Sequence, residues 1–69
     1  MMTEREWFLL DWLAKEDFSY LGECQGEELD SLVERGLARI WPNDERPREY
    51  WRVTMTPAGM AAVLERVKR

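Results

Sequence analysis

Residues 53–59, with the sequence Val-Thr-Met-Thr-Pro-Ala-Gly, decide the fold. Apolar and polar side chains alternate up to Thr56, as in a strand with one buried face. Thr56 suits the N-cap of a helix, and Pro57 suits its first position, where the N–H that proline lacks would have no partner. The stretch therefore predicts a strand that leads directly into a last helix.

A β-hairpin is expected before this corner. Residues 50–55 alternate, so that Trp51, Val53 and Met55 face one side, and residues 38–41 form a shorter strand. The turn-forming and breaker residues between the two strands are Pro42, Asn43, Asp44 and Pro47. The pattern predicts two antiparallel strands joined by a long loop.

Three helical segments are expected before the hairpin. Thr3 and Glu6 fit a capping box for a helix over residues 4–15. Gly36 suits the left-handed position that follows a helix over residues 27–35. Between these two helices, capped by Asp17 or Ser19, we expect a short helix that contains Phe18, Tyr20 and Leu21.

The apolar spacing predicts one small core. The last helix is expected to bury a stripe made by Met60, Val63, Leu64 and Val67. The core as a whole is expected to contain Leu10, Leu13, Leu29, Leu32, Val33, Ile40, Val53, Met55, Leu64 and Val67. With 69 residues, the chain is expected to form one α+β domain over residues 1–69.

In this order, the elements resemble a winged helix-turn-helix domain. Residues 32–37, Leu-Val-Glu-Arg-Gly-Leu, are similar to the end of a recognition helix that passes into the wing. Residues 53–59 are similar to the step from strand to helix that follows the wing in MarR-like and PadR-like regulators. The resemblance covers roughly residues 28–64. It implies a small winged-helix fold, with three N-terminal helices, a hairpin wing and a C-terminal helix, and it implies DNA binding.

Composition excludes several classes of chemistry. The chain has no histidine and one cysteine, so it contains neither a Cys–His or Ser–His nucleophile pair nor a ligand set for structural zinc. It also lacks a glycine-rich phosphate loop. We therefore expect no catalysis, no cofactor and no bound metal.

Composition also bears on location. No apolar run approaches the ~18–20 residues that span a bilayer, so we expect no membrane association. The charged residues within Met1–Glu6 do not suit a signal peptide, and a single cysteine cannot form an internal disulfide. These features predict a cytoplasmic protein.

Charge is divided unevenly along the chain. Residues 1–34 contain two basic and ten acidic residues, a charge of −8, whereas residues 35–69 contain eight basic and four acidic residues, a charge of +4. In the helix over residues 27–35, the side opposite the apolar residues carries Glu27, Asp30 and Glu34. Such a surface repels a phosphate backbone, because DNA affinity depends on neutralisation of phosphates by Lys and Arg.

These acids have a functional interpretation. At ~1.5 Å per residue, Glu27, Asp30 and Glu34 place one charge every ~5 Å, and a DNA strand carries one every ~3.4 Å. Together with Glu23 they predict a partner-binding acidic face. In size and charge, the chain is similar to the DNA-mimic inhibitors that phages make against restriction or CRISPR effectors. The leading hypothesis is a non-enzymatic anti-CRISPR or anti-restriction type inhibitor that binds a basic nucleic-acid site on a partner protein. A merely solvated acidic face is the simpler alternative.

The hairpin supports a second hypothesis. Its arginines are Arg39, Arg46, Arg48 and Arg52. They are candidates for phosphate contacts in a winged helix-turn-helix transcription regulator that binds duplex DNA. The equally simple alternative is that they pair with Asp44, Glu45 and Glu49.

Aromatic residues offer a third kind of candidate site. Phe8 and Trp12 lie near the polar side of the first helix. Because the first helix of a winged-helix domain can be packed on two sides, we expect both residues in the core. The alternative is that they form a surface for a partner or for a homodimer. Trp41 is expected to pack on the hairpin first and to serve as a contact residue second. Cys24 is expected to be a small buried apolar group.

Overall fold

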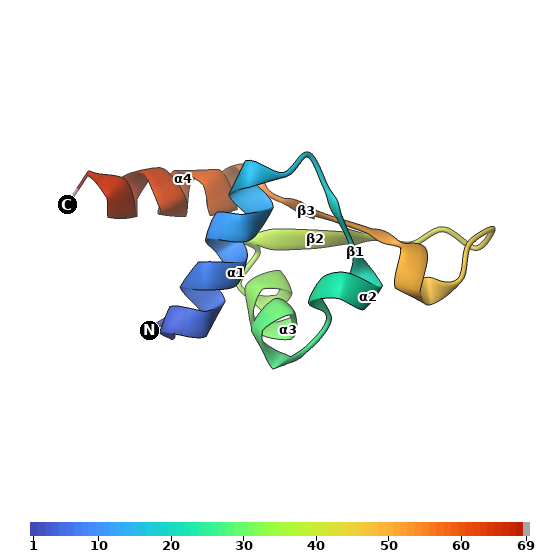
Figure 1. The fold of residues 1–69 in the computed structure, drawn as a ribbon. Helices are drawn as coiled ribbons and strands as arrows, with labels where there is room; N and C mark the ends of the chain where they lie inside the picture. The colour runs from blue at the N-terminus through green and yellow to red at the C-terminus, as the bar shows by residue number, and fades with distance from the viewer. Residues whose placement is uncertain (69) are drawn as a thin grey trace.

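Residues 1–68, described by a computed structural model, form four α-helices and a three-stranded antiparallel sheet (Figure 1). Along the chain, the elements are α1 (Glu4–Lys15), β1 (Ser19–Tyr20), α2 (Leu21–Cys24), α3 (Glu27–Glu34), β2 (Ala38–Trp41), the 3-10 helix η1 (Arg48–Tyr50), β3 (Arg52–Met55) and α4 (Pro57–Val67). The expected α+β class and the antiparallel hairpin are confirmed.

The central strand of the sheet is β3, with β2 on one side and β1 on the other. The predicted short helix is wrong for Phe18 and Tyr20, since Tyr20 belongs to β1 and pairs with Arg52 in β3. The N–H of Leu21 also donates to the carbonyl of Trp51 at 2.8 Å. These hydrogen bonds to a distant strand hold the backbone extended, and the helix begins only with α2.

The core lies between the inner face of the sheet and helices α1 and α3. Its buried apolar residues are Leu9, Leu10, Leu13, Leu21, Cys24, Leu29, Leu32, Ala38 and Val53. The expected core positions that are confirmed as buried are Leu10, Leu13, Leu29, Leu32 and Val53. Ile40 and Met55 pack against them and are half-buried.

The last helix differs most from the expectation. Leu64 is 54% exposed and Val67 is 77% exposed, so neither belongs to the core, and Met60 is exposed as well. The reason is that α4 extends beyond the sheet (Figure 1), and it packs against the core through Ala62 and Val63. Val33 is also exposed. The inward side of α3 is centred on Leu29 and Leu32, and Val33 lies at its edge.

The corner at residues 53–59 forms as predicted, and its geometry is tight. The hydroxyl of Thr56 accepts the N–H of Gly59 at 3.0 Å and donates to the carbonyl of Gly36 at 2.6 Å. Gly36 has a φ of 76°, a conformation that favours glycine. A Cβ atom on Gly59 would collide with the carbonyl oxygen of Leu37. The corner therefore joins the end of α3, the end of β3 and the start of α4.

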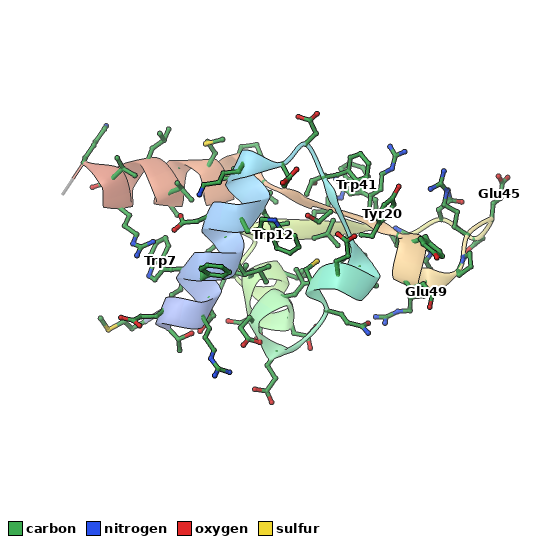
Figure 2. The ribbon with its side chains drawn as sticks, in the orientation of Figure 1. Trp7, Trp12, Tyr20, Trp41, Glu45 and Glu49 are labelled. Atoms are coloured by element: carbon green, nitrogen blue, oxygen red, sulfur yellow. The ribbon has the colours of Figure 1, made fainter. Side chains whose placement is uncertain are left out.

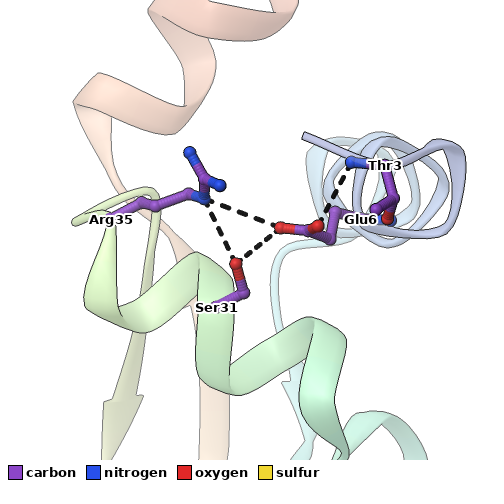
Figure 3. A network of polar contacts seen from close by, with 4 residues as sticks. All are labelled: Thr3, Glu6, Ser31 and Arg35. Carbon is purple, nitrogen blue, oxygen red and sulfur yellow. Dashed lines mark hydrogen bonds and ion pairs between the residues drawn. The ribbon is translucent and has the colours of Figure 1, made fainter. Parts of the chain in front are cut away.

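A polar network joins α1 to α3 (Figure 3). The capping box is confirmed, since the Glu6 N–H donates to the Thr3 hydroxyl and the Thr3 N–H donates to the Glu6 carboxylate. The buried Glu6 carboxylate also accepts the hydroxyl of Ser31, and Arg35 Nε lies 3.6 Å from its Oε2. The hydrogen bond from Ser31, and then that from Thr3, lower the pKa of Glu6 below its usual value.

The tight corner makes Gly59 sensitive to substitution. We expect Gly59→Ala to destabilise the fold by about 1–3 kcal/mol, because the added methyl group has no room beside the Leu37 carbonyl. In an open helix, the same change would raise stability by about 1 kcal/mol. Urea unfolding followed by circular dichroism measures the difference, and an unchanged or increased stability would contradict the proposed close approach.

The network also predicts a pH dependence. We expect Glu6→Gln to lower the midpoint of thermal unfolding at pH 7 by more than Glu4→Gln, which removes the same charge from an exposed position of α1. Since the pKa of Glu6 is lowered in the folded state, its contribution is present above the usual pKa of glutamate and is lost as the pH falls through the lower, folded-state pKa. The difference between Glu6→Gln and the unaltered protein should therefore shrink below about pH 4. A constant difference down to about pH 2 would count against this role.

Candidate functional site

The predicted acidic residues lie on an open surface. Glu27, Asp30 and Glu34 project from α3 on the side opposite the buried Leu29 and Leu32, and they are exposed. Glu23 is exposed on α2; we call these four residues the acidic face. The ion pairs within residues 1–68 are Arg5–Glu28, Arg35–Glu6 and Arg66–Asp11. None of these pairs neutralises the acidic face.

An apolar hollow adjoins the acidic face. Its volume is about 310 Å³, and its lining includes Phe8, Leu9 and Trp12 from α1, Glu23 and Cys24 from α2, and Glu28 from α3. The expectation that Phe8 is a core residue is wrong, because its side chain is 76% exposed. Trp12 is half-buried and packs against the core. The structure thus brings together residues from two predicted candidate sites, namely Phe8 and Trp12 on α1 and Glu23 of the acidic face.

The hollow itself was not predicted from the sequence. The spacing of Phe8 and Trp12 by one helical turn places them side by side on α1. What the sequence did not show is that α2 lies next to this pair. The predicted short helix contains Phe18, Tyr20 and Leu21, whereas the structure has β1 at Ser19–Tyr20 and places Glu23 and Cys24 on α2, beside α1.

The hairpin arginines, Arg39, Arg46, Arg48 and Arg52, are all exposed. The expected alternative, in which they pair with carboxylates of the hairpin loop, is wrong within residues 1–68, since no such pair lies within 4.0 Å. Three of their guanidinium groups, those of Arg39, Arg48 and Arg52, lie over aromatic rings instead. The distances to ring centroids are 3.8 Å for Arg39–Trp41, 4.4 Å for Arg52–Phe18 and 5.8 Å for Arg48–Trp51.

Trp41 packs on the hairpin, as expected, and part of its surface remains open. Its indole N–H donates to the hydroxyl of Thr54 at 2.8 Å, which fixes the ring on the hairpin. The side chain is nevertheless 44% exposed. It stands on the side of the sheet away from α3 (Figure 2), so that Trp41 and the acidic face lie on opposite sides of the molecule.

The hairpin loop is anchored at its base. The indole N–H of Trp51 donates to the carbonyl of Asn43 at 2.9 Å and to that of Arg46 at 3.3 Å. The 3-10 helix η1 packs against α2, where a Cβ atom on Gly22 would lie 3.1 Å from the Cβ of Glu49. Gly22, which weakens the helical pattern in the sequence, marks this close approach of η1.

The remaining candidates concern Cys24, metals and membranes. Cys24 is buried, as expected, and burial, followed by the charge of Glu23, raises the pKa of its thiol. Residues 1–68 contain no group of three or more His, Cys, Asp or Glu side chains that is suited to hold a metal ion. Within the same residues, no helix is long and apolar enough to cross a membrane.

Comparisons of the chain with protein-family models, curated proteins and solved structures found no match.

Proposed function

We propose that this chain is a non-enzymatic, cytoplasmic winged-helix module that binds, through its acidic face, a basic nucleic-acid site on a partner protein. The order of helices, with a β-hairpin between α3 and α4, supports the winged-helix assignment. The observation that carries the function is the exposure of Glu23, Glu27, Asp30 and Glu34 without any ion pair in the described residues.

Electrostatics favour a basic partner over DNA at α3. Two like charges 4 Å apart repel by about 1 kcal/mol in bulk water, and by about 4 kcal/mol at the effective dielectric of a protein surface. Glu27, Asp30 and Glu34 of α3 would face phosphates in a major groove. Against lysine and arginine side chains the same charges attract, and they accelerate association.

The apolar hollow offers an anchor site for an apolar side chain, which the charges of the acidic face do not provide. Affinity in protein interfaces depends on a few apolar or aromatic anchors that are shielded from water. Phe8 and Trp12 offer such an anchor site beside Glu23, in a hollow that Arg5 and its ion-pair partner Glu28 also line. A basic segment with one large apolar side chain would complement both features, in the manner of a phage inhibitor that occupies the nucleic-acid site of a CRISPR or restriction effector.

Charge reversal on the acidic face tests the proposal. Purified restriction endonucleases and CRISPR effector complexes are assayed for DNA binding with increasing amounts of the protein. We expect the protein to compete with DNA for at least one of them, and the combined change Glu27→Lys, Asp30→Lys and Glu34→Lys to weaken competition at least tenfold, about 1.4 kcal/mol.

The matched control changes Glu4, Glu16 and Glu65 to Lys. These exposed residues lie outside the acidic face, and their replacement alters the net charge by the same amount. Competition that survives the change on α3, or that both variants lose equally, would reject the acidic face as the binding surface.

A second candidate function is a winged helix-turn-helix regulator that binds duplex DNA through its hairpin. The observation in its favour is that the hairpin arginines have no carboxylate partner in the described residues. The exposed stripe of Met60, Leu64 and Val67 on α4 would suit the self-association that a homodimeric regulator requires.

A salt titration with duplex DNA distinguishes this candidate. If the hairpin binds phosphates, the affinity should fall steeply with salt, and Arg46→Ala with Arg48→Ala should reduce the slope of log affinity against log salt by about 2. The control Arg5→Ala with Lys15→Ala removes equal charge from exposed positions on α1. Absence of binding at low salt would remove this candidate.

A further inference from the structure

The outer face of the sheet is distinguished by its composition. The strand register places Tyr20 of β1, Arg52 of β3 and Trp41 of β2 opposite one another, in one row across all three strands. The neighbouring row on the inner face contains Ser19, Val53 and Ile40, of which Val53 is fully buried. Since successive residues of a strand point to opposite faces, the row with Tyr20, Arg52 and Trp41 faces away from α1 and α3.

Further residues extend this row into a surface of aromatic rings and guanidinium groups. Phe18 and Tyr50 both meet the ring of Tyr20 edge to face, with centroids 5.4 and 5.8 Å away. Arg52 lies over Phe18, and Arg39 lies over Trp41. We call this surface the outer face; its residues are Phe18, Tyr20, Arg39, Trp41, Tyr50 and Arg52.

The arginines of the outer face are positioned but not neutralised. The rings hold the guanidinium groups in place, and within residues 1–68 no carboxylate lies within 4.0 Å of either Arg39 or Arg52. A stacked guanidinium group keeps its N–H donors at its edge, where they can bind an anion in a bidentate manner. Its second planar face remains suited to another flat group.

Two hollows adjoin this arrangement, and Trp41 and Arg52 line both of them. One has a volume of about 320 Å³ and is also lined by Arg46 and Tyr50. The other has a volume of about 370 Å³ and is also lined by Phe18 and by Asp17, its one acidic residue. Each hollow thus combines aromatic surface with at least one guanidinium group.

We propose that the outer face binds single-stranded nucleic acid, with unpaired bases in the hollows beside Trp41 and Arg52 and phosphates on the arginines. Bases stack on aromatic rings and on guanidinium planes, and this stacking tolerates any sequence. In a duplex the bases are already stacked within the helix, so that a duplex offers the outer face its phosphates alone. An acidic protein segment would satisfy the arginines but would leave the aromatic surface without a matching group.

This inference does not depend on the proposed function. The outer face and the acidic face lie on opposite sides of the sheet and share no residue (Figure 2). Binding of a single strand at one face and of a basic protein at the other can therefore be tested separately.

The test measures fluorescence anisotropy with three labelled probes at low salt. The probes are an oligothymidylate of about 15 nucleotides, a duplex of similar length and a polyglutamate peptide. We expect the single strand to bind at least about tenfold more tightly than the duplex. Trp41→Ala should weaken binding of the single strand about tenfold, and Trp41→Phe should restore most of it, because phenylalanine retains a ring for stacking.

A second pair of variants keeps the test decisive if Trp41→Ala perturbs the hairpin. Arg39→Gln with Arg52→Gln should weaken binding of the single strand at least tenfold, whereas Arg5→Gln with Lys15→Gln, which removes the same charge elsewhere, should change it less than threefold. Equal affinity for single strand and duplex, preference for polyglutamate, equal effects of the two double variants or no binding of the oligothymidylate would each overturn the proposal.

Discussion

The close approach of the Gly59 backbone to the carbonyl of Leu37 determines how α4 packs on the segment between α3 and β2. At this point the first turn of α4 lies directly on the segment that joins α3 to β2. Any side chain larger than hydrogen at residue 59 would separate them. The hydroxyl of Thr56 completes the junction, because it caps α4 and also donates to the carbonyl of Gly36, just beyond the end of α3. The position of the hairpin relative to α3, and with it the separation of the acidic face from the outer face, depends on this corner.

Local patterns were sufficient for much of the fold. Thr3 and Glu6 predicted the start of α1, and Thr56 with Pro57 predicted the start of α4, because caps are formed by residues close together in the chain. The alternation in β3 likewise predicted which side chains face the core. Tyr20 shows where such reasoning fails. Its extended conformation is imposed by pairing with Arg52, a residue far away in the sequence.

The candidate surfaces were predictable to different degrees. Exposure of Glu27, Asp30 and Glu34 followed from helical periodicity and the opposite position of Leu29 and Leu32. The stripe on α4 was misassigned because periodicity identifies an apolar side but not whether anything covers it. The stacking of Arg39 and Arg52 on aromatic rings depends on the strand register and on the position of Phe18. Neither can be predicted from the residues that are close together in the sequence.

The anchoring of the hairpin loop has a consequence for recognition. Every residue from 41 to 50 is exposed, yet the indole of Trp51 binds two carbonyl groups of the loop, and the N–H of Leu21 ties the backbone of Trp51 to the start of α2. Much of the conformational entropy that a free loop of this length would lose on meeting a ligand has therefore already been lost during folding. If Arg46 and Arg48 bind a ligand, their contacts at such a preorganised loop would contribute more of their interaction energy to affinity than the same contacts in a mobile segment.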